Sequence, residues 1–284
     1  MGNLVRFATG SRIGDYVVEG DIGEGYEAVH VLLPRRVRIE VMHPTFAGLK
    51  PVAVRMMREA CILEALHHPG VPRVFEVGIL AEGNRPWVAS ELVAGDSLSI
   101  AMTPTDVLAL VRDVAGILAY AHDRGIVHRD LRLDEIVRTG PTRGYAIVIT
   151  NWTEARVDSS DLARAADVFD LGTIAAQLLG GGVPARIKMM IDDLLVANPM
   201  SRPSAAEVRA RAKLILETLD EDDIIEETIE LVELDAPTAS SAPPPVPRTR
   251  TSSSRIRWTP ALGVKTPPHA IPNLPSIGVL KPRS

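Results

Sequence analysis

The sequence predicts an α+β protein with two lobes, a smaller β-rich lobe followed by a larger helical one. In the first 95 residues, apolar and polar residues alternate along several short runs, which is typical of half-buried strands. After Gly95 the apolar residues recur at helical spacing. A third observation, a change of composition near residue 217, separates this domain from a tail of different character.

The N-terminal lobe is expected to consist of strands around one helix. A turn containing Gly23 and Gly25 separates the first two strands. The helix has its apolar residues at helical spacing and ends before the run His67-His68-Pro69-Gly70. The expected strands cover residues 16–22, 28–33, 37–42, 71–79 and 87–93, and the helix covers residues 51–66.

The C-terminal lobe is expected to be helical. Its longest helix has Asp106 in the first turn and Gly125 just beyond its end. A short hairpin-like region at 126–149 interrupts the helices, and Ser204 is the expected N-cap of the last one. The expected helices cover residues 105–124, 168–179, 187–196 and 204–217.

Bulk composition excludes several classes of protein. The net charge of −5 argues against a general nucleic-acid binder, which needs a basic surface. The single Cys61 excludes an internal disulfide framework and fits a reducing compartment. No apolar run approaches the roughly 20 residues of a transmembrane helix. We therefore expect a cytoplasmic protein without a membrane segment.

The last 67 residues, 218–284, have the composition of a tail. Ten acidic and no basic residues lie between Glu217 and Asp235, whereas the stretch 237–284 has seven Lys or Arg, no acids and eleven of the 22 prolines. Such a segment buries too little apolar surface to offset its chain entropy. We expect this tail to be mostly disordered.

The order of several motifs resembles the bacterial branch of the eukaryotic-like (Hanks-type) serine/threonine protein kinase family. Any one of these motifs is weak evidence, but all occur in the family's order and spacing. They are His128-Arg129-Asp130-Leu131-Arg132, Asp167-Val168-Phe169-Asp170-Leu171-Gly172, Glu59, His68-Pro69-Gly70, and the run 198–204. The resemblance implies a bilobal protein kinase-like fold, with the N-lobe at 12–93 and the C-lobe at 94–217.

Phosphoryl transfer in this family depends on positioning and charge neutralisation, so each position that supplies a charge matters. The glycine-rich loop retains Gly23 and Gly25. The family's phosphate-binding lysine aligns with Glu40, a reversal of charge. Glu40 is then expected to face Glu59, the helix residue that the lysine normally pairs with, and to repel it.

Arg38 occupies the place where the family has a small residue against adenine. Side chains two residues apart on a strand share a face, so Arg38 and Glu40 are expected on the same side. Arg38 either points into the cleft, where it pairs with Glu40, Glu59 or Glu91 and fills the nucleotide space, or extends into solvent.

The catalytic loop and the metal positions are partly changed. Asp130 retains the position of the proton acceptor, and His128 is expected to pack rather than to titrate. Glu135 stands where the family has its metal-binding Asn, and Asn151 stands where it has the metal-binding Asp. Trp152 is expected to fill the core position of the family's Phe. No metal site is expected.

The activation segment is short. Only 13 residues, 154–166, separate Thr153 from Asp167, and the family's Ala-Pro-Glu is absent. Arg202, which resembles the arginine that pairs with that Glu, is therefore expected to turn to Asp167, to Asp170 or to solvent. Asp167 itself is expected to have a structural role.

These changes favour a pseudokinase, a domain that is not an enzyme and acts as a scaffold or allosteric partner. We expect no ATP or Mg²⁺ as cofactor, and other signalling proteins as partners, with an active kinase as one candidate. The alternatives are a weak or merely nucleotide-binding serine/threonine kinase, and a docking or phosphate-accepting tail anchored by the domain. The tail's Thr259-Pro260, Thr266-Pro267 and isolated Trp258 motivate the last alternative.

Overall fold

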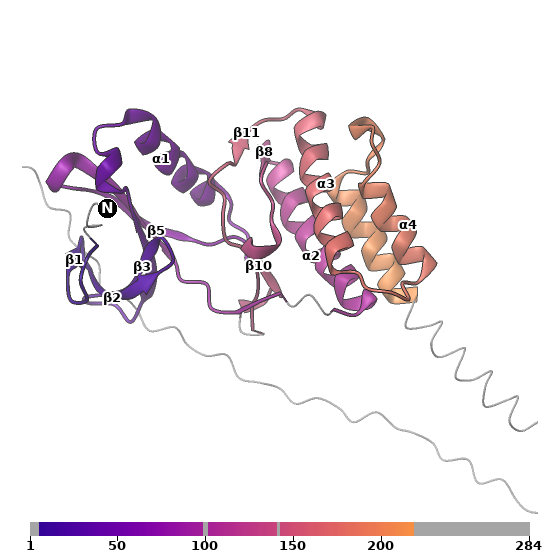
Figure 1. Cartoon of the computed structure of the whole chain (residues 1–284), viewed down its shortest axis with the longest axis horizontal. Helices are drawn as coiled ribbons and strands as arrows, with labels where there is room; N and C mark the ends of the chain where they lie inside the picture. Colours follow the sequence, from indigo (N-terminus) through magenta and orange to yellow (C-terminus); the bar gives the residue numbers. More distant parts are fainter. Residues whose placement is uncertain (1–5, 99–101, 141–142, 219–284) are drawn as a thin grey trace, which may run out of the picture. The chain divides into compact units, whose positions relative to one another are not determined.

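In the computed structural model, the described residues are 6–98, 102–140 and 143–218 (Figure 1). The chain divides into two compact units, Met1–Asp235 and Ala236–Ser284. The first unit carries all the elements described below. The predicted tail at 219–284 and the alternating acidic segment within it lie outside the described residues.

The N-lobe is a six-stranded antiparallel sheet with one long helix, α1 (Lys50–Ala65), in contact with its last two strands. Alternation of buried and exposed side chains along β4 and β2 gives the sheet one apolar face. In sheet order the strands are β1 (Arg12–Ile13), β2 (Tyr16–Ile22), β3 (Gly25–His30), β4 (Arg36–Val41), β6 (Arg85–Glu91) and β5 (Val74–Leu80).

The turn between β2 and β3 requires both of its glycines. Gly23 has φ of +56°, a left-handed conformation that favours glycine. A Cβ at Gly25 would lie only 2.8 Å from the carbonyl oxygen of Ile39, so the backbone of β3 approaches β4 closely here. This turn stands over one end of the cleft described below, where Ile22 and Glu24 line the cavity.

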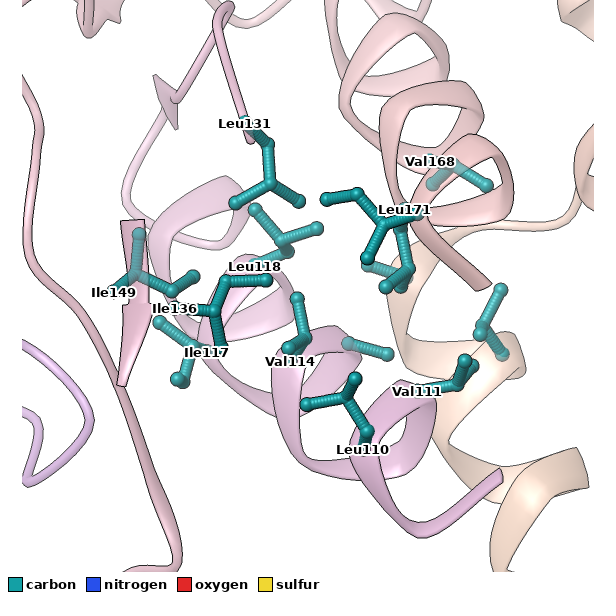
Figure 2. Packing of buried hydrophobic residues seen from close by; sticks show 14 of the residues in the cluster. Leu110, Val111, Val114, Ile117, Leu118, Leu131, Ile136, Ile149, Val168 and Leu171 are labelled. Atoms are coloured by element: carbon teal, nitrogen blue, oxygen red, sulfur yellow. The ribbon is translucent and has the colours of Figure 1, made fainter. Parts of the chain in front are cut away.

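The C-lobe is built on α2 (Pro104–His122) and α3 (Asp161–Leu178), which pack against each other (Figure 2). Thr103 caps α2 by accepting a hydrogen bond from the Asp106 amide at 3.1 Å. Apolar residues of both helices and of β10 meet in one core; Figure 2 shows Leu110, Val114, Ile117, Leu118, Ile149, Val168 and Leu171 among them. α4 (Ala185–Leu194) and a final helix at 205–218 complete this lobe.

Two small sheets lie on the side of the C-lobe that faces the N-lobe. β10 (Ile147–Ile149), β9 (Ile136–Arg138) and β7 (Asp96–Ser97) form one, and β11 (Arg156–Val157) pairs with β8 (Ile126–Val127) in the other. The second sheet attaches the short segment after β10 to the start of the catalytic loop.

The predicted bilobal α+β fold is confirmed, and most element bounds agree within a few residues. The clearest difference is α3, which was predicted from residue 168 and begins at Asp161. Ser160 caps this earlier start by accepting from the Ala163 amide at 3.3 Å. The predicted apolar run begins about two turns later than the helix, because Asp161 and Leu162 in the first turn are exposed. Among the described residues, no helix combines the length and apolarity needed to cross a membrane.

Candidate functional site

A cavity of about 480 Å³ lies between the N-lobe sheet, α1 and the C-lobe. Its apolar lining includes Val41, Leu63, Val88 and Val137. The charged residues of its lining are mostly acidic, whereas a site that receives a polyphosphate needs positive charge. Four acids and one base line it: Glu24, Glu40, Glu59, Glu91 and Arg38.

Arg38 and Glu40 form an ion pair inside this cavity. The Arg38 Nε donates to Glu40 Oε1 at 2.8 Å, and the two side chains are 34% and 42% exposed. Both therefore face the cleft, as their spacing on β4 predicts. Arg38 lines the cavity but does not fill it, so the expected filling of the nucleotide space from within is only partial.

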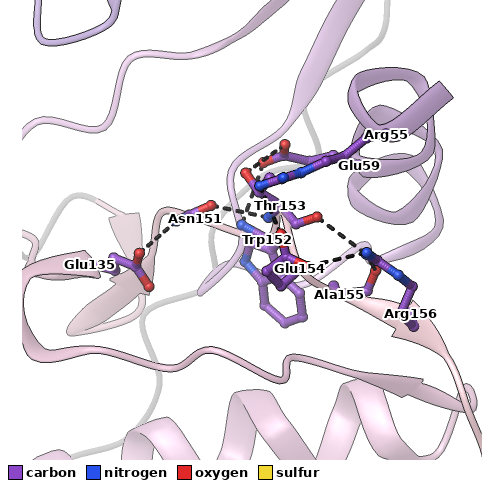
Figure 3. A network of polar contacts seen from close by, with 9 residues as sticks. All are labelled: Arg55, Glu59, Glu135, Asn151, Trp152, Thr153, Glu154, Ala155 and Arg156. Atoms are coloured by element: carbon purple, nitrogen blue, oxygen red, sulfur yellow. Dashed lines mark hydrogen bonds and ion pairs between the residues drawn. The ribbon is translucent and has the colours of Figure 1, made fainter. Parts of the chain in front are cut away.

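Glu59 finds its partners in the segment that follows β10, not on the sheet (Figure 3). The Thr153 hydroxyl donates to Glu59 Oε2 at 2.9 Å, and the Trp152 amide approaches Oε1 at 3.4 Å. Burial, with the neighbouring charge of Glu40, raises the pKa of Glu59. The two hydrogen bonds from the segment after β10 oppose this rise in the pKa of Glu59.

A second contact joins α1 to the same segment. Arg55 on α1 lies 2.7 Å from Glu154, which Arg156 also contacts at 3.2 Å (Figure 3). Together with the Thr153–Glu59 hydrogen bond, this ion pair holds α1 against the C-lobe. Sequence reasoning missed the roles of Thr153 and Arg55, because nothing in the local pattern indicates a partner about 100 residues away.

The two positions assigned to metal binding contact each other directly. Asn151 Nδ2 donates to Glu135 Oε1 at 2.5 Å, and Asn151 Oδ1 accepts from the Thr153 amide at 3.0 Å. Burial raises the pKa of Glu135, while the Asn151 hydrogen bond and Arg132 lower it. Glu135 Oε2 is buried and has no hydrogen-bond partner within the described residues.

These residues do not fit the Mg²⁺ site that the fold family implies. A hard divalent cation requires several oxygen ligands, usually with more than one negative charge among them. Asn151 is neutral and its only ligand oxygen is already bonded to a backbone amide, which leaves one carboxylate oxygen of Glu135. Nowhere in the part of the chain that the structure describes do three His, Cys, Asp or Glu side chains gather closely enough to hold a metal.

The catalytic loop is anchored by Asp167, a fully buried residue of α3. Its carboxylate accepts the amides of His128 at 2.8 Å and Arg129 at 2.7 Å, and lies 2.8 Å from Nε2 of His122. Arg129 has φ of +74°, which is strained for a residue with a side chain, and the two amide bonds hold it there. Asp130 follows at the exposed tip of the loop.

Trp152 is fully buried and occupies the core position predicted for it. Its indole donates to the Ile149 carbonyl at 2.9 Å, and its ring meets the His128 ring edge-on at 4.7 Å between centroids. Burial lowers the pKa of His128, so its imidazole is neutral at physiological pH. Both residues are placed for packing.

Arg202 does not reach either aspartate expected for it. It donates to the backbone carbonyls of Val196 at 2.9 Å and Ala165 at 3.0 Å, and lies over the Phe169 ring at 4.6 Å. Backbone carbonyls are strong acceptors that lie nearer to the guanidinium than any carboxylate, so the prediction of Asp167 or Asp170 as its partner is wrong.

Glu91 differs from the prediction as well. It was a candidate partner of Arg38, but both of its carboxylate oxygens are bound by Arg143. Arg143 was not singled out from the sequence, because the two residues are 52 positions apart and share no recognisable motif.

Comparison with known proteins identifies the relatives of this chain. No family model matches it. It is 34% identical over 149 residues to serine/threonine-protein kinase pkn2 of Myxococcus xanthus, and 26% identical over 204 residues to serine/threonine-protein kinase PknL of Mycobacterium tuberculosis strain H37Rv. These alignments cover 51% and 60% of this chain, but only 18% and 50% of the relatives. The chain thus spans at most about half the length of these relatives.

Among solved structures, the kinase domain of Mycobacterium tuberculosis PknI is similar, with a TM-score of 0.57 and 24% identity. The match covers 73% of this chain and 99% of that domain. At this identity the likeness supports the fold alone.

These comparisons contradict one prediction. The substitutions at residues 40, 135 and 151 led to the expectation that the chain is not an enzyme, yet its relatives are named serine/threonine-protein kinases. The substitutions alter the charges of the cleft, but they do not show that the domain is inactive. The sequence motifs, the bilobal fold and these relatives agree: the chain has a protein kinase-like fold and is similar to bacterial serine/threonine-protein kinases.

Proposed function

We propose that this domain is a cytoplasmic signalling module of the serine/threonine kinase family that binds ATP weakly and acts on other signalling proteins by contact. Two observations support the proposal. The backbone scaffold of the catalytic loop is retained, whereas the charges that line the cleft differ from those of the family. Asp167 still holds the backbone of the catalytic loop in place. The surface that this domain presents to a partner is therefore expected to resemble that of a kinase. An active serine/threonine kinase is the first candidate partner.

One observation carries the proposal of weak ATP binding: the Arg38–Glu40 ion pair in the cavity. Among the described residues, Arg38 is the one cation that lines the cavity; Glu40 neutralises it, and Glu59 and Glu24 add negative charge. The triphosphate of ATP would approach these carboxylates without a counter-charge, and like charges close together are unfavourable. Arg38 also occupies part of the nucleotide space.

Isothermal titration with ATP and Mg²⁺ tests this proposal. The wild-type chain is expected to bind with a Kd weaker than about 1 mM. The double variant Arg38→Ala/Glu40→Lys is expected to bind at least about ten times more tightly, because it removes the obstruction and restores a phosphate-binding cation. A wild-type Kd in the low micromolar range would refute weak binding.

A matched control pairs Arg36 of the same strand, β4, with Glu19 of β2. Arg36 and Glu19 form an ion pair at 2.6 Å outside the cavity. The variant Arg36→Ala/Glu19→Lys makes the same two chemical changes, so its ATP affinity is expected to stay at the wild-type value. An equal gain in this control would show that net charge, not the cleft, governs the affinity.

Action by contact is tested with purified serine/threonine kinases of the source organism. Addition of the full chain is expected to change the phosphotransfer rate of at least one of them, with saturation, and without ATP bound to this domain. The variant Arg38→Ala/Glu40→Lys is expected to keep this effect. No effect on any of these kinases would argue against the contact function.

A second candidate function is serine/threonine phosphotransfer at a low rate, the activity that the names of the relatives carry. Asp130 favours it, because the residue stays exposed at the tip of a loop whose backbone is fixed by Asp167. Transfer of labelled γ-phosphate to the chain itself or to a protein substrate would support it. The signal must be lost in Asp130→Asn, which retains size while removing the proton acceptor.

A further inference from the structure

Arg143 forms hydrogen bonds with two separate segments of the chain. It lies between β9 and β10, on the C-lobe side of the cleft. Its guanidinium binds both carboxylate oxygens of Glu91, one of them at 3.0 Å. It also donates to the carbonyl of Pro69 at 2.6 Å and to that of Val71 at 3.3 Å.

Glu91 lies where the connection between the two lobes begins. Glu91 is the last residue of β6 and precedes the short connection, 92–95, between the lobes. The connection ends in β7, whose Ser97 is paired with Val137 of β9. The Arg143–Glu91 ion pair therefore joins the start of the connection to the loop between β9 and β10, and β9 holds the other end of the connection.

The loop that follows α1 is fixed to the C-lobe at the same place. The Ile149 amide donates to the Gly70 carbonyl at 3.0 Å, and the Tyr120 hydroxyl donates to the His67 carbonyl at 3.0 Å. A Cβ at Gly70 would lie 2.4 Å from the Ile117 side chain, so this loop sits directly on the core of α2. Arg143 adds the bonds to Pro69 and Val71.

The Arg143–Glu91 contact is well shielded from water. The two side chains are 17% and 25% exposed, and Glu91 also accepts the Arg73 amide at 3.3 Å. A bidentate pair of this kind is stronger and more directional than a surface ion pair. By contrast, Arg138 in the same hairpin is exposed and makes only a 4.0 Å contact with the Met102 sulfur among the described residues.

We propose that Arg143 is an interlobe latch, a positioning residue that fixes the angle between the lobes and thereby the width of the cleft. It holds the N-lobe at two points, the end of β6 and the loop after α1. Arg143 itself does not line the cavity, whereas its partner Glu91 does, so the latch connects the cavity wall to the C-lobe. Its loss leaves both lobes folded and widens the range of angles between them.

The single native cysteine allows a direct test in the full chain. Cys61 is exposed on α1, and Lys188 is exposed on α4, so Lys188→Cys supplies a second spin-label site in the other lobe. Pulsed electron spin resonance is expected to give one narrow distance distribution in the parent. Arg143→Ala is expected to broaden that distribution to at least about twice its width, as a freed hinge samples several angles.

Three further variants make the result decisive. Glu91→Gln, which retains size and removes the charge, is expected to broaden the distribution like Arg143→Ala. Arg143→Lys retains the charge but cannot make the bidentate contact, and is expected to give an intermediate width. Arg138→Ala is expected to leave the parental distribution unchanged.

An unchanged width in Arg143→Ala and Glu91→Gln would overturn the proposal. Should Arg143→Ala fail to fold, Glu91→Gln and Arg143→Lys decide alone. Hydrogen exchange supplies a readout that general destabilisation does not mimic. Exchange is expected to accelerate at least about tenfold in 67–71 and 92–95, with the α2 and α3 core unchanged. Uniform acceleration throughout the domain would also overturn it.

Discussion

The side-chain amide of Asn151 donates to the carboxylate of Glu135 at 2.5 Å. The family has an amide at the position of residue 135 and a carboxylate at the position of residue 151. In this chain the two groups are exchanged. The exchange conserves one charge and one amide, yet it changes what the pair does. The Asn151 amide donates to the charged Glu135 carboxylate, and the single side-chain oxygen of Asn151 accepts from the Thr153 amide.

Restoring a carboxylate at residue 151 is expected to make the stability of the fold depend on a divalent cation. Asn151→Asp places two carboxylates in contact, which costs about 1–3 kcal/mol in the free energy of unfolding when no cation is present. Thermal unfolding in EDTA is expected to show a lower Tm. Millimolar Mg²⁺ is expected to recover it in this variant and to leave the wild-type Tm unchanged.

The control exchanges both groups. Glu135→Gln/Asn151→Asp returns to one amide and one carboxylate, and its Tm in EDTA is expected to be near that of the wild type. A Tm of Asn151→Asp that equals the wild-type value in EDTA would show that the two side chains do not interact.

The Thr153 hydroxyl is expected to stabilise the position of α1. Thr153→Val retains the shape and removes the 2.9 Å hydrogen bond to Glu59. Because Glu59 is mostly buried, the loss is expected to cost about 1–2 kcal/mol, measured by denaturant unfolding. Thr153→Ser keeps the hydroxyl and is expected to lose less than half as much. Equal losses in both variants would assign the effect to the methyl group instead.

Asp170 is expected to make stability depend on pH. Burial raises the pKa of Asp170 to about 6, with Asp167 adding to the shift. Because the folded pKa lies above that of the unfolded chain, the ionised carboxylate destabilises the folded state. This cost grows as pH rises from about 4 to about 6 and is constant above that.

Asp170→Asn is therefore expected to raise Tm at pH 7.5. The gain corresponds to about 1 kcal/mol once solvent screening of this partly exposed group is allowed for. It is expected to shrink below pH 6 and to vanish near pH 4. A gain that stays constant from pH 8 to pH 4 would show that ionisation of Asp170 is not its source.

Trp152 is expected to be among the most sensitive core positions. Trp152→Ala removes a fully buried side chain and is expected to cost about 3–5 kcal/mol. Trp152→Phe retains most of the volume but leaves the Ile149 carbonyl without its donor, for about 1–3 kcal/mol. Trp87→Phe is the control, since the Trp87 indole makes no hydrogen bond within the described residues. A Trp152→Phe loss no larger than the control would contradict a role for the indole N–H.

The parts of this site that the sequence predicts are those set by local geometry. Arg38 and Glu40 were placed on one face of a strand by their spacing, and they do form an ion pair. Trp152 was predicted to be buried because the resemblance places it at the family's Phe position, and it is fully buried. The assignment of lobes followed from two different periodicities.

The parts that the sequence does not predict depend on contacts between distant segments. Glu59 and Thr153 are 94 residues apart, and Glu91 and Arg143 are 52 apart. Their partners are chosen by how the lobes meet, which no local pattern encodes. The prediction for Arg202 was wrong for a different reason. Its partners are backbone carbonyls, which every residue has, so the residue types do not indicate them.

The bonds of Arg202 have a consequence for how this domain tolerates change. Its guanidinium is satisfied by the carbonyls of Val196 and Ala165 and by the Phe169 ring, all within the C-lobe helices and their ends. The C-lobe helices therefore do not depend on an ion pair between Arg202 and the segment 154–160, whose own contacts run to Arg55 of α1 and, through β11, to β8.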